Sequence, residues 1–201
     1  MPGGTPSVAA RFSGVSAKTL LLPAFVLAFV SLTCPAAEPF AGRLFGDGFS
    51  VRLSSPNQAD ANTLMLTPSG LLADNSPVTR EVDGLVMRAA LKDIDGDGVP
   101  ELLVWLVRPG GGFYGSVLAY STNQRKALSE IWIDPPEPGD LVGYMGQDEF
   151  EVVQHTFVRR FPVFKAGDTK DWPTGGIRQF QYKLEKSKSG WRLKLNRVVN
   201  Y

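Results

Sequence analysis

Acidic residues alternate with other residues in one short segment that leads directly into an apolar run. The segment offers an oxygen donor at every second residue. The donors are the side chains of Asp93, Asp95, Asp97 and Glu101 and the backbone carbonyl of Val99. Calcium takes roughly six to eight oxygen ligands, so this spacing predicts a structural calcium site. The segment is not a full EF-hand, because Val104 stands where the bidentate glutamate would be. The alternative is an Asp-Gly-rich β-turn whose aspartates cap backbone amides without a metal.

Residues suited to catalysis are scarce in this chain. The 201 residues include one histidine and one cysteine, too few for a zinc cluster built from these ligands. His155 falls within a strand-like run and lacks the G-x-S-x-G context that would supply a nucleophile. Glu149 and Glu151, or Asp148 and Glu149, could form a glycosidase pair, but their spacing alone does not favour one. We therefore expect a protein that is not an enzyme and requires no cofactor.

A glycine-rich stretch with two adjacent aromatic residues separates two strand-like runs. It consists of Gly110, Gly111, Gly112, Phe113, Tyr114, Gly115 and Ser116. Glycine lets the backbone approach a partner closely, and exposed aromatic side chains anchor interfaces. We expect this loop to contact another protein, the alternative being a hairpin turn whose aromatic side chains fold back onto the scaffold. A phosphate site is disfavoured, because the Lys-Ser/Thr ending and following helix are absent.

The elements that would position these residues follow a two-residue period. Apolar side chains alternate with polar ones at 49–53, 180–184 and 191–195, and each segment predicts a strand with one solvated face. The short polar link at 186–190 makes the last two segments a predicted β-hairpin. Further strands are predicted at 84–91, 101–107, 116–122, 128–133 and 150–164.

The predicted fold class is all-β, an antiparallel β-sandwich of about eight strands. No long amphipathic helix competes with the strands, and clusters of Gly, Pro, Asp and Asn separate them. Short strands joined by turn-rich loops favour a sandwich or barrel over a βαβ sheet. The absence of an internal repeat disfavours solenoids and propellers.

The N-terminal segment has the order of charges and apolar residues that is typical of a secretion signal. Two basic residues precede an uncharged apolar stretch at 20–32, and Ala36 and Ala37 follow it. The stretch is shorter than the ~20 residues that a membrane-spanning helix needs. We therefore expect residues 1–37 to be a cleaved signal peptide that directs export to the periplasm.

Two alternatives to cleavage remain. An uncleaved anchor would have to accommodate Pro23 within a spanning helix, which disfavours it. A lipoprotein would be attached through Cys34, but Ser31, Leu32 and Thr33 fit poorly with the small residues that usually precede a lipidated cysteine.

Cleavage would leave a single cysteine-free domain at 38–201. Such a domain cannot depend on disulfides in an oxidising compartment, so its core must stabilise it. The chain has 21 basic and 20 acidic residues and would lose only Arg11 and Lys18, which leaves a formal net charge of −1. We expect no nucleic-acid partner and no stable membrane insertion, because no cluster of basic residues is present.

Four spaced motifs occur in one order, together with the acidic turn and the strand at Trp191, and the combination is far more specific than any one of them. The motifs are YGSVLAYS at 114–121, YMGQDEF at 144–150, VRRFP at 158–162 and PTGG at 173–176. Over most of its mature length the chain resembles the bacterial periplasmic inhibitors of invertebrate-type lysozymes.

The resemblance implies a β-sandwich, often a homodimer, that inserts protruding loops into the cleft of a lysozyme. It implies that Tyr114 and its glycine neighbours form the main contact, with a second contact at Thr174, Gly175 and Gly176. In this sequence glycines 110–112 stand where the family has a serine and a glycine, so no serine hydroxyl can bond a catalytic carboxylate. Phe113 is also bulkier than the small residue that the family would have beside the tyrosine. Both differences bear on which lysozyme is bound and how tightly.

The predicted function is therefore inhibition of lysozyme by occlusion of its active-site cleft. The alternative is a calcium-stabilised carbohydrate-binding or adhesion module, which would use the acidic turn and stack sugars on exposed aromatic residues such as Trp172. Glycan binding without any lysozyme would favour this module, and turnover of a peptidoglycan fragment would favour an enzyme. The sequence does not indicate which lysozyme type is bound or how tightly.

Overall fold

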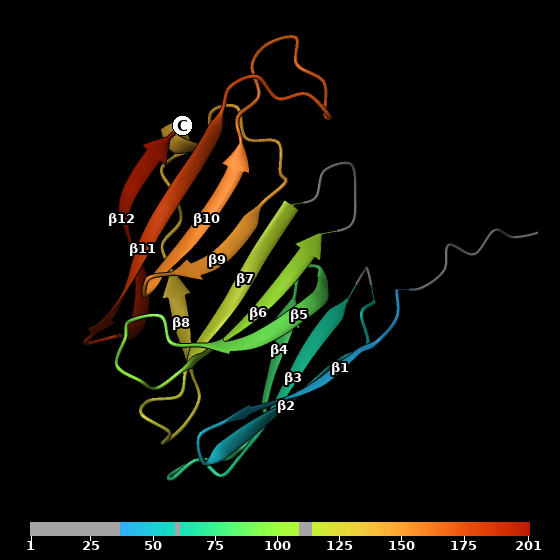
Figure 1. The fold of residues 1–201 in the computed structure, drawn as a ribbon. Helices are drawn as coiled ribbons and strands as arrows, with labels where there is room; N and C mark the ends of the chain where they lie inside the picture. The colour runs from blue at the N-terminus through green and yellow to red at the C-terminus, as the bar shows by residue number, and fades with distance from the viewer. Residues whose placement is uncertain (1–36, 59–60, 109–113) are drawn as a thin grey trace, which may run out of the picture. The chain divides into compact units, whose positions relative to one another are not determined.

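The computed structural model describes residues 37–58, 61–108 and 114–201, and β-strands dominate these residues (Figure 1). The described residues contain twelve strands and one short 3-10 helix, η1 (Pro138–Leu141). The strands are β1 (Phe40–Gly46), β2 (Phe49–Ser55), β3 (Asn62–Ser69), β4 (Val78–Val82), β5 (Leu85–Lys92), β6 (Glu101–Arg108), β7 (Tyr114–Ser121), β8 (Ser129–Ile133), β9 (Glu149–Val153), β10 (Thr156–Pro162), β11 (Ile177–Ser187) and β12 (Gly190–Asn200).

The strands form two sheets. The small sheet has the order β1-β2-β3-β4, and the large sheet has the order β5-β6-β7-β8-β12-β11-β10-β9. Neighbouring strands are antiparallel except β8 and β12, which pair in parallel from Trp191 opposite Ile131 to Leu193 opposite Ile133. The strand nearest the C-terminal end of the chain therefore lies in the interior of the large sheet.

The predicted all-β sandwich is confirmed, although the described residues contain more strands than the predicted eight. The strands predicted at 84–91, 101–107, 116–122 and 128–133 correspond to β5 to β8, and the predicted C-terminal hairpin corresponds to β11 and β12. The sequence interpretation did not include β1, β3 or β4. The parallel pair was not expected either, because it joins strands far apart in the chain.

The single strand predicted at 150–164 is wrong. It is a hairpin of β9 and β10, with Val153 opposite Thr156 and the turn residues Gln154 and His155 between them. Both turn residues have positive φ angles, 47° and 56°, as a two-residue turn of the tightest hairpins requires. Asparagine and glycine usually occupy such turns, so Gln154 and His155 are not a recognisable turn signal. His155 therefore lies at a hairpin tip and not within a strand.

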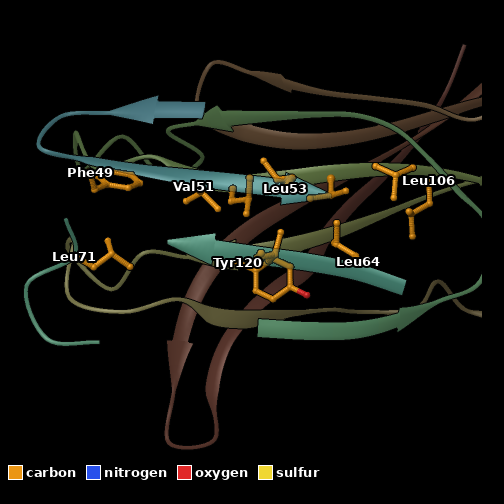
Figure 2. Packing of buried hydrophobic residues seen from close by; sticks show 11 residues of the cluster. Phe49, Val51, Leu53, Leu64, Leu71, Leu106 and Tyr120 are labelled. Atoms are coloured by element: carbon orange, nitrogen blue, oxygen red, sulfur yellow. The ribbon is translucent and has the colours of Figure 1, made fainter. Parts of the chain in front are cut away.

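Two hydrophobic cores share the strand β6. Leu102, Val104 and Leu106 pack in the first core, between the small sheet and β5 to β7 (Figure 2). Leu103 and Trp105, which alternate with them, pack in the second core, within the large sheet. Side chains on successive strand positions point to opposite faces, so a strand between two cores is apolar throughout. This explains the unbroken run of apolar residues from 102 to 107.

The large sheet curls so that its two edge strands, β5 and β9, approach each other. Phe157, Phe161, Phe180 and Tyr182 of β10 and β11 pack in the same second core as Trp105 of β6. At the seam, Nη2 of Arg88 on β5 donates to the carbonyl of Phe150 on β9 at 3.4 Å. A side-chain contact, and not strand pairing, therefore connects the first and last strands in the sheet order.

The expected signal segment lies outside the described residues except for Ala37, and so does Cys34. Among the residues that the structure describes, no helix has the length and apolar character needed to cross a membrane.

Candidate functional site

Tyr114 lies at the surface, at one end of the large sheet. It is the first residue of β7 and stands opposite Arg108, the last residue of β6 (Figure 1). Tyr114 is 39% exposed, and the centroid of its ring lies 5.7 Å from that of Tyr144 in an edge-to-face contact. The preceding residues predicted to contact a partner, Gly110, Gly111, Gly112 and Phe113, lie outside the described residues.

A buried carboxylate supports this end of β7. The side chain of Asp148 has no exposed surface and accepts three hydrogen bonds. The Gly115 amide donates to Oδ2 at 3.0 Å, the Tyr144 hydroxyl donates to the same oxygen, and Nε of Arg159 donates to Oδ1 at 2.7 Å. These four residues, which we call the Asp148 network, connect β7, the loop before β9 and strand β10.

Aromatic rings surround the cation of the Asp148 network. The Arg159 guanidinium lies 4.9 Å from the ring centroid of Tyr144 and 5.4 Å from that of Phe161. Burial alone would lower the pKa of Arg159, but the Asp148 carboxylate outweighs it and the pKa ends above its usual range. Burial, and then the bond to Asp148, raise the pKa of Tyr144 above its usual range. The Tyr144 hydroxyl therefore remains protonated and acts as a donor.

Gly115 is required by packing against its own chain. A Cβ at this position would lie 2.9 Å from the Phe150 ring and 3.0 Å from Cβ of Asp148, closer than such atoms normally approach. The absence of a side chain lets β7 lie against the loop that carries Asp148. Ser116 is exposed and borders a cavity of about 200 Å³ together with Gly115 and Arg159.

The predicted second contact, Thr174 with Gly175 and Gly176, lies in the loop between β10 and β11. The Thr174 amide and hydroxyl donate to Asp168 at 2.8 and 2.9 Å, and these bonds fix the loop locally. Gly176 has a φ of +82°, and a Cβ there would lie 2.1 Å from the Tyr201 carbonyl oxygen. The glycine is therefore needed for the backbone path of the loop.

A hydrogen bond connects the 144–148 segment, which supports Tyr114, with the β10–β11 loop, which carries the second predicted contact. Nε2 of Gln147, next to Asp148, donates to the Lys170 carbonyl at 2.9 Å. Exposed apolar side chains occur on both sides of this connection, with Met145 at 43% and Trp172 at 74% exposure. The site at this end thus consists of Tyr114, the 144–148 segment and the β10–β11 loop.

Sequence reasoning did not identify the roles of Tyr144, Asp148 and Arg159. Tyr144 and Arg159 were noted only as parts of the motifs at 144–150 and 158–162, and Asp148 was considered otherwise only as one half of a possible glycosidase pair. The one local signal was the four-residue spacing of Tyr144 and Asp148 in a glycine-containing segment, which does not specify a bond to a residue as distant as Gly115. Their association depends on the pairing of β9 with β10 and on the curl of the large sheet.

The aspartates of the acidic turn accept hydrogen bonds from nearby backbone amides. Asp93 accepts hydrogen bonds from the amides of Gly96 and Gly98 at 2.7 and 3.1 Å, as the metal-free turn predicts. Asp95 and Asp97 accept bonds from the amides two residues later. Oxygens of Asp93, Asp95 and Glu101 also lie within 4.8 Å of one another, and this carboxylate set fits a hard cation such as calcium. Asp97 is not part of that carboxylate set.

Glu101 is the buried member of the acidic turn and is 4% exposed. Burial raises its pKa to about 8, although the Ile94 amide donates to its Oε2 at 3.1 Å. His155, at the tip of the β9–β10 hairpin, lies beside the same turn, with Nδ1 4.0 Å from Oδ2 of Asp93. The lone histidine is therefore next to the acidic turn.

We compared the chain with protein-family models and with curated proteins. No family model matches the chain, and no curated protein matches it.

Proposed function

We propose that this protein is exported and inhibits a lysozyme, of the invertebrate type, by occluding its active-site cleft. The observation that carries the proposal is the placement of Tyr114, an exposed aromatic residue on a rigid base. The Asp148 network holds the residue after it, and the ring of Tyr144 supports its side chain. A preorganised aromatic residue loses little conformational entropy on binding, which favours its use as an interface anchor.

The chemistry of the target suits a tyrosine. Lysozymes cleave glycosidic bonds with a pair of acidic residues in a cleft. A phenol hydroxyl can donate a hydrogen bond to a carboxylate there, and such charge-assisted bonds are stronger than neutral ones. The apolar ring would bury surface where the sugar chain otherwise lies. Thr174 and the exposed Trp172 on the neighbouring loop would extend the contact, and a homodimer would present two such ends.

The experiment that tests the proposal is lysozyme inhibition by the Tyr114→Ala variant. We expect inhibition of an invertebrate-type lysozyme to weaken by at least about tenfold, as for an interface hot spot. The melting temperature should stay unchanged, because the side chain is exposed. The matched control is Phe45→Ala, which removes an exposed aromatic residue from β1 of the small sheet. Equal inhibition by wild type and Tyr114→Ala would reject Tyr114 as the anchor.

The target type can be determined in the same assay. Wild type is incubated with invertebrate-, chicken- and goose-type lysozymes, and lysis of bacterial cells is followed. Protection against the invertebrate type alone is the expected result. Protection against none of the three would contradict the inhibitor proposal itself.

A second candidate function is a carbohydrate-binding module, and the exposure of Trp172 favours it. Trp172 is 74% exposed on the β10–β11 loop, and an exposed indole face is suited to stacking on a sugar ring. Binding to a glycan array in the absence of lysozyme, lost in Trp172→Ala and retained in Tyr114→Ala, would support this function over inhibition.

A further inference from the structure

A cleft of about 390 Å³ opens at the seam of the large sheet, where β5 and β6 meet β9 and β10. Its lining includes Arg88, Trp105, Glu149, Glu151, Val158 and Arg160. The 3.4 Å bond from Arg88 to the Phe150 carbonyl crosses this seam and is long for a hydrogen bond. We call this feature the seam cleft.

Four charged side chains of the seam cleft form no ion pair within the described part of the chain. They are two cations and two anions: Arg88, Arg160, Glu149 and Glu151. Glu149 stands directly opposite Arg160 in the β9–β10 pairing, yet the two do not bond. Nε of Arg160 donates instead to Gln179 at 2.6 Å, which orients the guanidinium. Charges of both signs are therefore free to bind a ligand.

Trp105 adds a buried donor to the seam cleft. The residue is 8% exposed, and its Nε1 has no hydrogen-bond partner and no exposed surface. An indole N–H can only donate, and buried donors without an acceptor are uncommon because their desolvation is not offset. The Arg88 guanidinium lies 4.0 Å from the centroid of the same ring. The Arg88 guanidinium is suited to a carboxylate, and the Trp105 indole beside it reports a ligand bound there.

The free edge of β9 offers backbone groups beside these side chains. In a hairpin with a two-residue turn, hydrogen-bonded and non-hydrogen-bonded pairs alternate away from the turn. Val153 and Thr156 flank the turn, so Phe150 and Val152 occupy the non-bonded pairs and direct their amides and carbonyls away from β10. The bond from Arg88 to the Phe150 carbonyl agrees with this direction. An extended peptide could therefore pair with this edge.

We propose that the seam cleft binds a short peptide with both ends free. Its carboxylate would accept from Arg88 and Arg160, and its ammonium group would lie between Glu149 and Glu151. A simple anion is disfavoured by the glutamates and a simple cation by the arginines. The volume falls in the range of about 300–1,000 Å³ that is typical of small-molecule sites. The proposal does not depend on lysozyme inhibition.

Nuclear magnetic resonance of the ¹⁵N-labelled full chain tests the proposal through the indole signals. The chain has four tryptophans, and Trp105→Phe assigns the signal of Trp105. Triglycine should shift the Trp105 indole signal saturably. The Trp191 indole already donates to Asn123 at 2.7 Å, so its signal should remain in place. Triglycine capped at both ends should cause no shift at Trp105.

Matched variants separate charge recognition from nonspecific contact. Arg88→Gln and Glu151→Gln should each weaken triglycine binding by at least about tenfold, because each removes one of the charges that bind the peptide. Arg197→Gln, an exposed substitution on β12, should leave binding unchanged. No saturable shift at Trp105 would overturn the proposal. Equal shifts with acetyl-triglycine or with triglycine amide would also overturn it, because only one end would then be recognised.

Discussion

A carboxylate with no exposed surface loses its hydration, and Asp148 offsets this loss with one cation and two neutral donors. Arg159, its cation, is itself only 15% exposed. Removing the charge of one partner would leave the other buried without compensation. At the scale of single residues, the position of Tyr114 therefore depends on Asp148.

We predict that Asp148→Asn lowers the free energy of unfolding by about 3–5 kcal/mol, the cost typical of breaking a buried ion pair. Urea denaturation followed by circular dichroism measures this change. Asp83→Asn is the matched control, because it breaks the exposed pair with Arg108 and should lower the free energy of unfolding far less than Asp148→Asn does. Similar costs for the two variants would show that the Asp148 network does not stabilise this end.

A second residue-scale prediction concerns the pH dependence of stability through Glu101. Its folded pKa of about 8 lies above its ordinary value of 4.5, so the folded state retains a proton that the unfolded state releases. The resulting stabilisation is complete below about pH 4.5 and is lost as the pH rises through about 8. In metal-free buffer, Glu101→Gln should remove this loss, because its amide stays neutral.

Melting temperatures of wild type and Glu101→Gln across that pH range test this prediction. The melting temperature of Glu101→Gln relative to that of wild type should increase as the pH rises. A difference in melting temperature that does not change with pH would show that the pKa of Glu101 is not raised in the folded protein.

At the scale of elements, the acidic turn is a strand-leading loop whose carboxylates repel one another when ionised. Burial, and then the charges of Asp97 and Asp93, raise the pKa of Asp95. A bound divalent cation would neutralise this repulsion. We predict that calcium raises the melting temperature of wild type and has less effect on Asp95→Asn. A hundredfold excess of calcium over its Kd would stabilise the fold by about 2.7 kcal/mol.

Differential scanning fluorimetry with calcium and with a chelator measures this effect. Asp83→Asn, an exposed acid elsewhere on the molecule, should respond to calcium as wild type does. No response in wild type at millimolar calcium would favour the metal-free turn, in which the aspartates only cap amides.

The elements also show what the sequence could predict. Strands with regular alternation or long apolar runs, such as 101–107 and 191–195, were predicted because one or two buried faces impose the pattern. The hairpin at Gln154 and His155 was missed, because neither residue is typical of positive φ. The Asp148 network could not be predicted, because Gly115, Asp148 and Arg159 meet only through strand order, which local periodicity does not encode.

At the scale of the whole molecule, the two cores are coupled through the shared strands β5 to β7. Leu102 and Leu103 are adjacent and fully buried, yet they belong to different cores. We predict that Leu102→Ala and Leu103→Ala each cost about 2–5 kcal/mol and that each variant unfolds in a single transition.

Two probes test this coupling. The tryptophans, at 105, 132, 172 and 191, lie outside the small sheet and report the large sheet by fluorescence, whereas circular dichroism reports both sheets. The two transitions should coincide in each variant. A fluorescence transition unaffected by Leu102→Ala would show that the cores unfold separately.

The interior position of β12 constrains when the molecule can fold. Until residues 190–200 are available, β8 and β11 each lack a neighbour, and the ladder remains divided into two pieces with open edges. A chain that is synthesised from its N-terminus therefore cannot complete this sheet before residues 190–200 have emerged from the ribosome. Open edges attract other strands, so an unfinished chain is vulnerable to aggregation unless a chaperone holds it.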